Sequence, residues 1–221
     1  MTPDPGTGAA GFEKSPGEQS IVAVIAEKRG QDYYRAVKEF VDTSFAEVDN
    51  RLVPLHLERT VNWLLELYPE ADEALLIAGI AHDIERAFRE EAVYRKMFHS
   101  DDAFLDSSFL DYHQQRSAKI IADFLENLGC PIELRDKVSY LVAHHETGGN
   151  FESDLLKDAD SLSFFQTNVD LFVTVKTRES SIDKVKNKFS WMFERITMPE
   201  ARDVCRPFYQ DAMARLARLE N

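Results

Sequence analysis

The sequence predicts an all-α fold, a compact bundle of helices forming a single domain. Apolar residues recur at steps of three and four along most of the chain after residue 17, the spacing of one helix face. Glycine and proline are scarce, with 9 and 8 among 221 residues, and several fall within the first twenty positions. Strands do not alternate regularly with helices, as an α/β sheet would require. This length suits one sizeable core.

The predicted domain begins after a short tail. Residues 1–17 are rich in proline, glycine and threonine and carry no apolar period, so we expect this segment to be disordered. From residue 18 the helical pattern continues to the end of the sequence. We therefore predict one helical domain over residues 18–221, with a central part at about 45–165 and C-terminal helices at 180–220.

The first helices follow from periodicity and from residues that begin or end a helix. Apolar positions predict helical segments across 18–45 and 51–68, and Pro69 ends the second of them. Asp72 has the position of an N-cap, and the helix that it starts is expected to carry residues 74–88.

The middle of the chain is less regular. Residues 89–108 are broken and charged, which predicts a short helix and a loop. Asp111 is expected to cap a helix that ends near Leu128, with Gly129 at its C-terminus. Pro131 opens the next helix, which runs to His144 and His145, and a turn follows at 148–150.

The C-terminal part adds helices at 152–165, 182–196 and 199–219. Between them, residues 169–175 (VDLFVTV) have the β-branched character of a strand. Their length also fits a buried helical turn, and periodicity alone leaves the two alternatives open.

Composition limits the partners. A formal net charge of −13 excludes a basic surface that tracks duplex nucleic acid, although bound metal can still attract a small phosphorylated substrate. No apolar run is long enough to cross a bilayer, so we expect no membrane association. Cys130 and Cys205 are far apart and suggest no disulfide framework. With no secretory signal pattern, these features predict a cytoplasmic protein.

Polar doublets in apolar surroundings mark the candidate site. His82 and Asp83 follow the run LLIAGIA, and His144 and His145 close the apolar segment VSYLVA. Asp160 lies among leucines in the predicted helix 152–165. Burying imidazoles and carboxylates is costly unless a metal or an ion pair compensates the lost hydration. Nitrogen and carboxylate ligands drawn from several helices are typical of metal sites in helical bundles.

The order of these residues resembles the HD-domain superfamily of metal-dependent phosphohydrolases, from about Phe45 to Phe165 and more weakly to about Ile196. The pattern consists of one histidine, the His-Asp doublet, a further histidine, the histidine pair and an aspartate. The resemblance implies a first metal ion held by His56, His82, Asp83 and Asp160. It also implies that Asp83 bridges to a second ion held by His113, His144 and His145.

The resemblance implies a divalent transition metal, one or two ions of Fe, Mn, Co, Ni or Zn. Asp83 and Arg86 would be catalytic, with Arg86 and Lys188 binding the phosphate. A solvated surface position is an equal alternative for Arg86 and is favoured for the basic run that includes Lys188 and Arg195. For Glu146 we favour a solvated helix end over a place beside the metal. A homodimer is left open.

The function implied is hydrolysis of a phosphate ester or pyrophosphate bond in a nucleotide or similar small metabolite by metal-activated water. The GYP segment that marks cyclic-di-GMP hydrolases is absent after the histidine pair, where residues 146–151 read ETGGNF. The layout is similar to small stand-alone HD hydrolases. Two alternatives stay open: a binuclear-iron HD-type oxygenase, and a non-catalytic metal-containing sensor or scaffold.

Overall fold

The computed structural model describes residues 32–46, 48, 52–89 and 106–220. Within these ranges the regular structure is entirely helical, so the predicted all-α fold is confirmed. Expectations for 1–17 and 18–31, and for most of 89–108, concern residues outside the described ones. Among the described residues, no helix combines the length and the apolar character needed to cross a membrane.

The first three described helices are α2 (Asp32–Phe45), α3 (Leu52–Leu67) and α4 (Glu73–Ala81). The Asp72 side chain accepts a hydrogen bond from the Leu75 amide at 3.0 Å, which confirms it as the N-cap of α4. Helix α4 is apolar on every side and every residue from Ala74 to Ala81 is buried, as expected for a helix at the centre of a core.

The prediction that this helix continues to residue 88 is wrong. Helix α4 ends at Ala81, and a 3₁₀ turn, η1 (Ile84–Phe88), follows the His82–Asp83 doublet. The His82 ring bonds the Gly79 carbonyl at 2.9 Å, the acceptor that the next α-helical amide would have used. The break turns the doublet out of the helix and gives its two side chains different directions.

Helices α6 (Ser107–Asn127) and α7 (Ile132–Ala143) pack against each other. Asp106 caps α6 by accepting from the Ser108 amide, so the predicted cap at Asp111 is wrong. Asp111 lies on an exposed part of the first turns of α6. Gly129 has a φ of 69°, the left-handed conformation that glycine adopts readily at a helix end.

Helix α8 (Phe151–Thr167) begins with a capping box formed by Asn150 and Ser153. The segment with strand character is helical instead, as α9 (Val169–Leu171), the π-helical turn η3 (Phe172–Lys176) and α10 (Thr177–Glu179). Helices α11 (Ile182–Glu194) and α12 (Pro199–Ala217) complete the chain, close to the predicted bounds.

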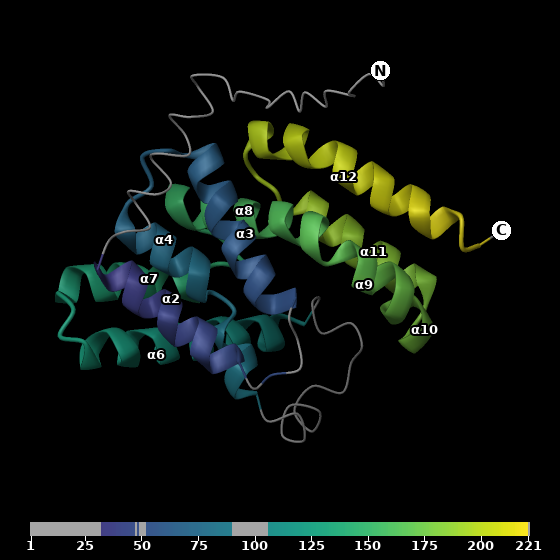
Figure 1. The fold of residues 1–221 in the computed structure, drawn as a ribbon. Coiled ribbons are helices and arrows are strands. Elements are labelled where there is room, and N and C mark those ends of the chain that lie inside the picture. Colours follow the sequence, from purple (N-terminus) through teal and green to yellow (C-terminus); the bar gives the residue numbers. More distant parts are fainter. Residues whose placement is uncertain (1–31, 47, 49–51, 90–105, 221) are drawn as a thin grey trace, which may run out of the picture.

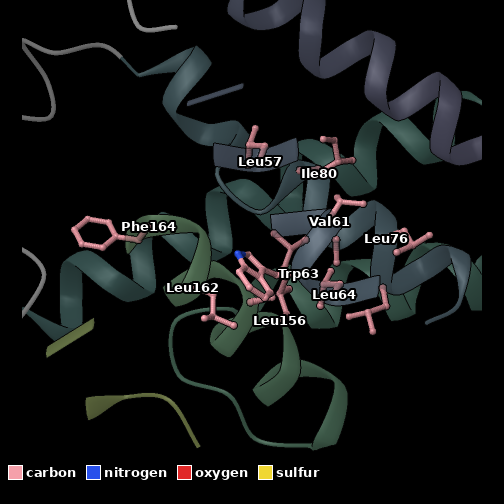
Figure 2. Close-up of a cluster of buried hydrophobic side chains, with 14 of the residues drawn as sticks. Leu57, Val61, Trp63, Leu64, Leu76, Ile80, Leu156, Leu162 and Phe164 are labelled. Atoms are coloured by element: carbon pink, nitrogen blue, oxygen red, sulfur yellow. The ribbon is translucent and has the colours of Figure 1, made fainter. Parts of the chain in front are cut away.

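Helices α3 and α8 pack against each other at the centre of the fold (Figure 1). Figure 1 shows α2, α4, α6 and α7 on one side of this pair, with α9 through α12 on the other. Leucines, isoleucine and valine of α3, α4 and α8 fill the space between them (Figure 2): Leu57, Val61, Leu64, Leu76, Ile80, Leu156 and Leu162.

Gly79 allows a close approach between α3 and α4. A Cβ at this position would lie 2.6 Å from the Leu64 Cδ1 atom and 3.3 Å from Val61. The two helices therefore pack closely one turn before His82. The same packing brings the rings of His56 and His82 to 5.4 Å between centroids.

Candidate metal centre

Four histidines and two aspartates from separate elements meet in the interior. His56 comes from α3, His113 from α6, and His82, Asp83 and His145 from the ends of α4 and α7. Asp160 faces them from α8. Each of the six is at most 6% exposed, and uncompensated burial of this many polar groups would be very costly.

The first cluster is formed by His56, His82 and Asp83, whose candidate ligand atoms all lie within 4.8 Å of one another. Asp160 Oδ1 adds a further oxygen at 2.9 Å from His56 Nε2 and 3.7 Å from His82 Nε2. These four residues are the set that the sequence predicts for the first ion.

The second cluster is formed by Asp83, His113 and His145, again within 4.8 Å of one another. Asp83 Oδ1 lies 2.7 Å from His113 Nε2 and 4.0 Å from His145 Nε2. Asp83 is therefore common to both clusters, and the resemblance implies a bridging position for it.

Two of the rings are oriented by backbone carbonyls. The Nδ1 atom of His82 lies 2.9 Å from the Gly79 oxygen, and that of His145 lies 2.7 Å from the Val142 oxygen. A carbonyl oxygen only accepts, so each Nδ1 must carry a proton, and in the neutral ring Nε2 is then the acceptor. Both Nε2 atoms are buried without a hydrogen-bond partner. Such a pair of unpartnered nitrogens facing carboxylates is suited to a cation.

The other two rings are held by side chains. Ser163 Oγ donates to the His56 carbonyl at 2.7 Å, so His56 Nδ1 is the donor to that hydroxyl at 2.8 Å. His113 Nδ1 donates to Glu85 Oε2 at 2.9 Å. In all four histidines Nδ1 is used in an oriented hydrogen bond and Nε2 faces Asp83 or Asp160, as is usual for metal-binding histidines.

Glu85 supports the second cluster from a fully buried position. Arg89 binds it through two nitrogens, at 2.9 and 2.5 Å, and Ser117 Oγ lies 3.2 Å from its amide nitrogen. Burial acts to raise the pKa of the Glu85 carboxyl, but Arg89 and His113 outweigh it and lower that pKa to about 2. Glu85 is therefore an ionised acceptor that orients His113. The sequence analysis does not assign Glu85 to the site, and the only signal for it is its place two residues after Asp83 in the segment DIER.

Arginines compensate the remaining carboxylates. Arg86 Nε lies 2.6 Å from Asp83 Oδ2, and Arg195 pairs with both Asp160 and Glu146. Burial acts to raise the pKa of Asp83 and Asp160, but the arginines and histidines beside them hold both well below the usual range. Both aspartates are thus ionised, the form that binds a metal.

The sequence favours a solvated surface position for Arg195 and Glu146, and the structure contradicts this prediction. The Arg195 side chain is 7% exposed and that of Glu146 is 10% exposed. Arg195 also donates through Nε to Ser161 Oγ at 2.8 Å, and its guanidinium lies 4.7 Å from the centre of the Trp191 ring. One arginine near the end of α11 thus connects two carboxylates of the centre.

The turn that carries Arg195 into the centre is anchored by Asp158. This buried carboxylate accepts hydrogen bonds from the amides of Thr197 and Met198, at 3.0 and 2.7 Å. Lys157 adds a bond to the Arg195 carbonyl at 2.8 Å. Asp158, which precedes Asp160 by two residues, therefore faces this turn and not the histidines.

His144 lies outside both clusters. Its Nδ1 atom bonds the Tyr140 carbonyl at 2.7 Å, and its ring stacks on the Tyr140 ring with centroids 4.2 Å apart. The side chain is partly exposed, whereas His145 is fully buried. Successive residues at a helix end point in different directions, so only one of the pair faces the interior.

A cavity of about 730 Å³ opens beside the centre. Its polar lining includes Asp83, Arg86, Asp160, Lys188 and Arg195, and the π-helical turn η3 also forms part of the wall. The apolar lining is formed by the following residues: Leu52, Val53, Phe164, Leu171, Phe172, Val175 and Met192. The lining therefore combines charged groups with apolar side chains, as small-molecule sites commonly do.

The two predicted phosphate-binding cations both line this cavity. Arg86 is partly exposed there while it contacts Asp83. The Lys188 ammonium lies 4.3 Å from the centre of the Trp191 ring, and burial lowers the pKa of Lys188 to about 8.

Comparison with known proteins assigns a family and no activity. Residues 41–198, more than half of the chain, match the family described as Domain of unknown function (DUF4202), and the chain belongs to it. Neither the curated proteins nor the solved structures gave a match. The matched range contains every residue of the two clusters.

Proposed function

We propose that this member of the DUF4202 family is a metal-dependent phosphohydrolase. Its substrate would be a nucleotide or similar small metabolite with a phosphate ester or pyrophosphate bond. The observation that carries the proposal is the convergence of four histidine Nε2 atoms on Asp83 and Asp160, with each Nδ1 already hydrogen-bonded. The order of these residues, which resembles that of HD-domain phosphohydrolases, supports the same conclusion.

His56, His82, Asp83 and Asp160 would hold one ion, and His113 and His145 would hold a second together with Asp83. Mixed nitrogen and carboxylate ligation suits Fe, Mn, Co, Ni or Zn. A bound divalent ion supplies an activated water near neutral pH and stabilises charge on phosphoryl oxygens. His144 is left out of the ligand set because its ring faces Tyr140.

The cations of the cavity have separate roles in this proposal. Arg86 lies beside Asp83 and is partly exposed to the cavity, so its remaining guanidinium nitrogens can bind phosphate oxygens. Lys188 lines the same cavity and adds a second positive charge. Arg195 is occupied by Asp160 and Glu146, so it orients carboxylates and does not bind substrate.

In this proposal the apolar residues that line the cavity exclude water and position the substrate. Phe164, Phe172 and Met192 face the cavity from three different elements. A substrate whose phosphate meets Arg86 would place the rest of its structure against these side chains. Removing water there strengthens each charge interaction with the phosphate.

The test uses the purified full chain loaded in turn with Mn²⁺, Co²⁺, Fe²⁺, Ni²⁺ or Zn²⁺. Phosphate release is measured with nucleoside mono-, di- and triphosphates, dinucleoside polyphosphates and sugar phosphates. We expect turnover of at least one nucleotide, lost on chelation and restored by metal.

Two results would contradict this function. Oxygen consumption with a diol substrate, without phosphate release, would indicate the oxygenase alternative. A fully loaded centre that turns over no member of the panel would indicate a sensor or scaffold.

A further inference from the structure

We propose that Glu146 is a ligand of the second metal ion, in the place that the sequence pattern assigns to His144. The inference rests on the proposed metal-dependent function, but it concerns a residue that the resemblance does not assign. With Glu146, each ion would have two histidines, one carboxylate of its own and the shared Asp83.

The first cluster shows how such a carboxylate is presented. Asp160 directs Oδ1 toward His56 and His82, at 2.9 and 3.7 Å from their Nε2 atoms. Its second oxygen, Oδ2, is paired with Arg195. One oxygen is thereby fixed by a cation of the protein, and the other is directed at the histidines.

Glu146 repeats this arrangement on the second cluster. Its Oε2 atom pairs with another nitrogen of the same Arg195 guanidinium. Its Oε1 atom lies 3.8 Å from His145 Nε2. The Asp160 and Glu146 carboxylates are thus presented by one arginine toward different halves of the centre.

An independent observation comes from the nitrogen that Oε1 faces. His145 Nε2 is fully buried and has no hydrogen-bond partner, and it also lies 4.0 Å from Asp83 Oδ1. At these separations the nitrogen makes no direct hydrogen bond to either oxygen. A cation bound to this nitrogen would satisfy it, and one carboxylate oxygen each of Asp83 and Glu146 lies within 4.0 Å of the same nitrogen.

The backbone explains why Glu146 and not His144 is available. Helix α7 ends at Ala143, and residues 144–147 form a turn in which the Glu146 amide donates to Gln114 Oε1 at 3.0 Å. Gln114 is buried on α6, one residue beyond His113. This bond fixes residue 146 beside the second cluster, while the His144 ring is directed toward Tyr140.

The experiment measures metal content and affinity in the full chain, so it does not depend on finding the substrate. The wild type and three variants, Glu146→Gln, His144→Ala and Asp160→Asn, are loaded with Co²⁺ or Mn²⁺ and desalted, and bound ions are counted by elemental analysis. Titration calorimetry gives the affinity of each site, and Co²⁺ absorption reports the ligands. Circular dichroism confirms that each variant is folded.

We expect two bound ions in the wild type and two in His144→Ala. At each site, the metal affinity of this variant should be within about threefold of the wild-type affinity. Glu146→Gln should weaken one site by more than the ~10–100-fold typical of outer-shell partners, and should change the Co²⁺ spectrum. Asp160→Asn should weaken the other site.

The inference is overturned if Glu146→Gln retains two ions with an unchanged Co²⁺ spectrum, or if His144→Ala loses the second ion. It is also overturned if the wild type binds a single ion. Phosphate release by a one-ion protein would still support the proposed function, so the two can fail separately.

Discussion

The two halves of the centre are supported in different ways. Around His56, His82 and Asp160, the support comes from distant segments: Ser163 on α8 bonds His56, and Arg195 near the end of α11 holds Asp160. Around His113 and His145, the support is nearer in sequence, because Glu85 and Arg89 follow Asp83 directly along η1. One half therefore depends on the C-terminal helices and the other on the turn after α4.

This difference has a consequence for how the centre can be damaged. A change in the C-terminal helices should first affect the half with Asp160, and a change in η1 should first affect the half with His113. Asp83 and Arg195 are exceptions, because Asp83 belongs to both clusters and Arg195 contacts Asp160 and Glu146 together.

The largest effect is expected from Asp83→Ala, which removes the carboxylate common to both halves. We expect loss of bound metal at both sites and no detectable phosphate release, because both ions lose the oxygen ligand that they share. Elemental analysis and the phosphate assay measure the two effects. The control is Asp123→Ala, which removes an exposed side chain paired with Lys119 in α6 and should behave as wild type. Retained metal and activity in Asp83→Ala would refute the shared-ligand arrangement.

The second prediction concerns Arg195→Ala. Two buried carboxylates lose their cation, and breaking a buried pair in this way costs about 3–5 kcal/mol of unfolding free energy. Urea denaturation of the metal-free chain measures it. Arg206→Ala, which removes an exposed arginine paired with Asp203, should change stability by less than about 1 kcal/mol. Equal stability of the two variants would show that Arg195 does not compensate the centre.

The comparison between the halves is sharpened by Glu85→Gln and Ser163→Ala. Glu85 orients His113 and Ser163 orients His56, so each variant disturbs one half. We expect Glu85→Gln to weaken the second site by about 10–100-fold and to leave the first nearly unchanged, with the reverse for Ser163→Ala. Calorimetric titration of each variant with Mn²⁺ measures the affinities of the two metal sites separately. If both variants weaken both sites alike, the halves are not supported independently.

The smallest effect is expected at Lys188. Because its pKa is lowered to about 8, the ammonium is charged below that pH and loses its charge as the pH rises through it. Substrate KM in the wild type should therefore increase by about tenfold between pH 7 and pH 9. Lys188→Arg keeps its charge over this range, so its KM should stay flat. Parallel KM profiles in the two proteins would exclude Lys188 as a phosphate contact.

Much of the fold could be predicted because the signals are local. The all-α class, the Asp72 cap and the glycine at the end of α6 each depend on a few consecutive residues. Two wrong or open predictions, the end of α4 and the conformation of 169–175, also have local causes in the structure. The His82 ring occupies the Gly79 carbonyl and ends α4 early, and the segment 169–175 becomes helical despite its β-branched residues.

For the site, the sequence by itself determined the residue types and their order, since His56, His82, Asp83, His113, His145 and Asp160 are brought together as the pattern predicts. Only the tertiary structure decided which side chain of the 144–146 turn faces inward and that Arg195 belongs to the interior. The physical reason is that the direction of a side chain at a helix end depends on contact partners from other parts of the chain. Tyr140, Gln114 and the Asp158-anchored turn are such partners, and spacing along the chain does not encode them.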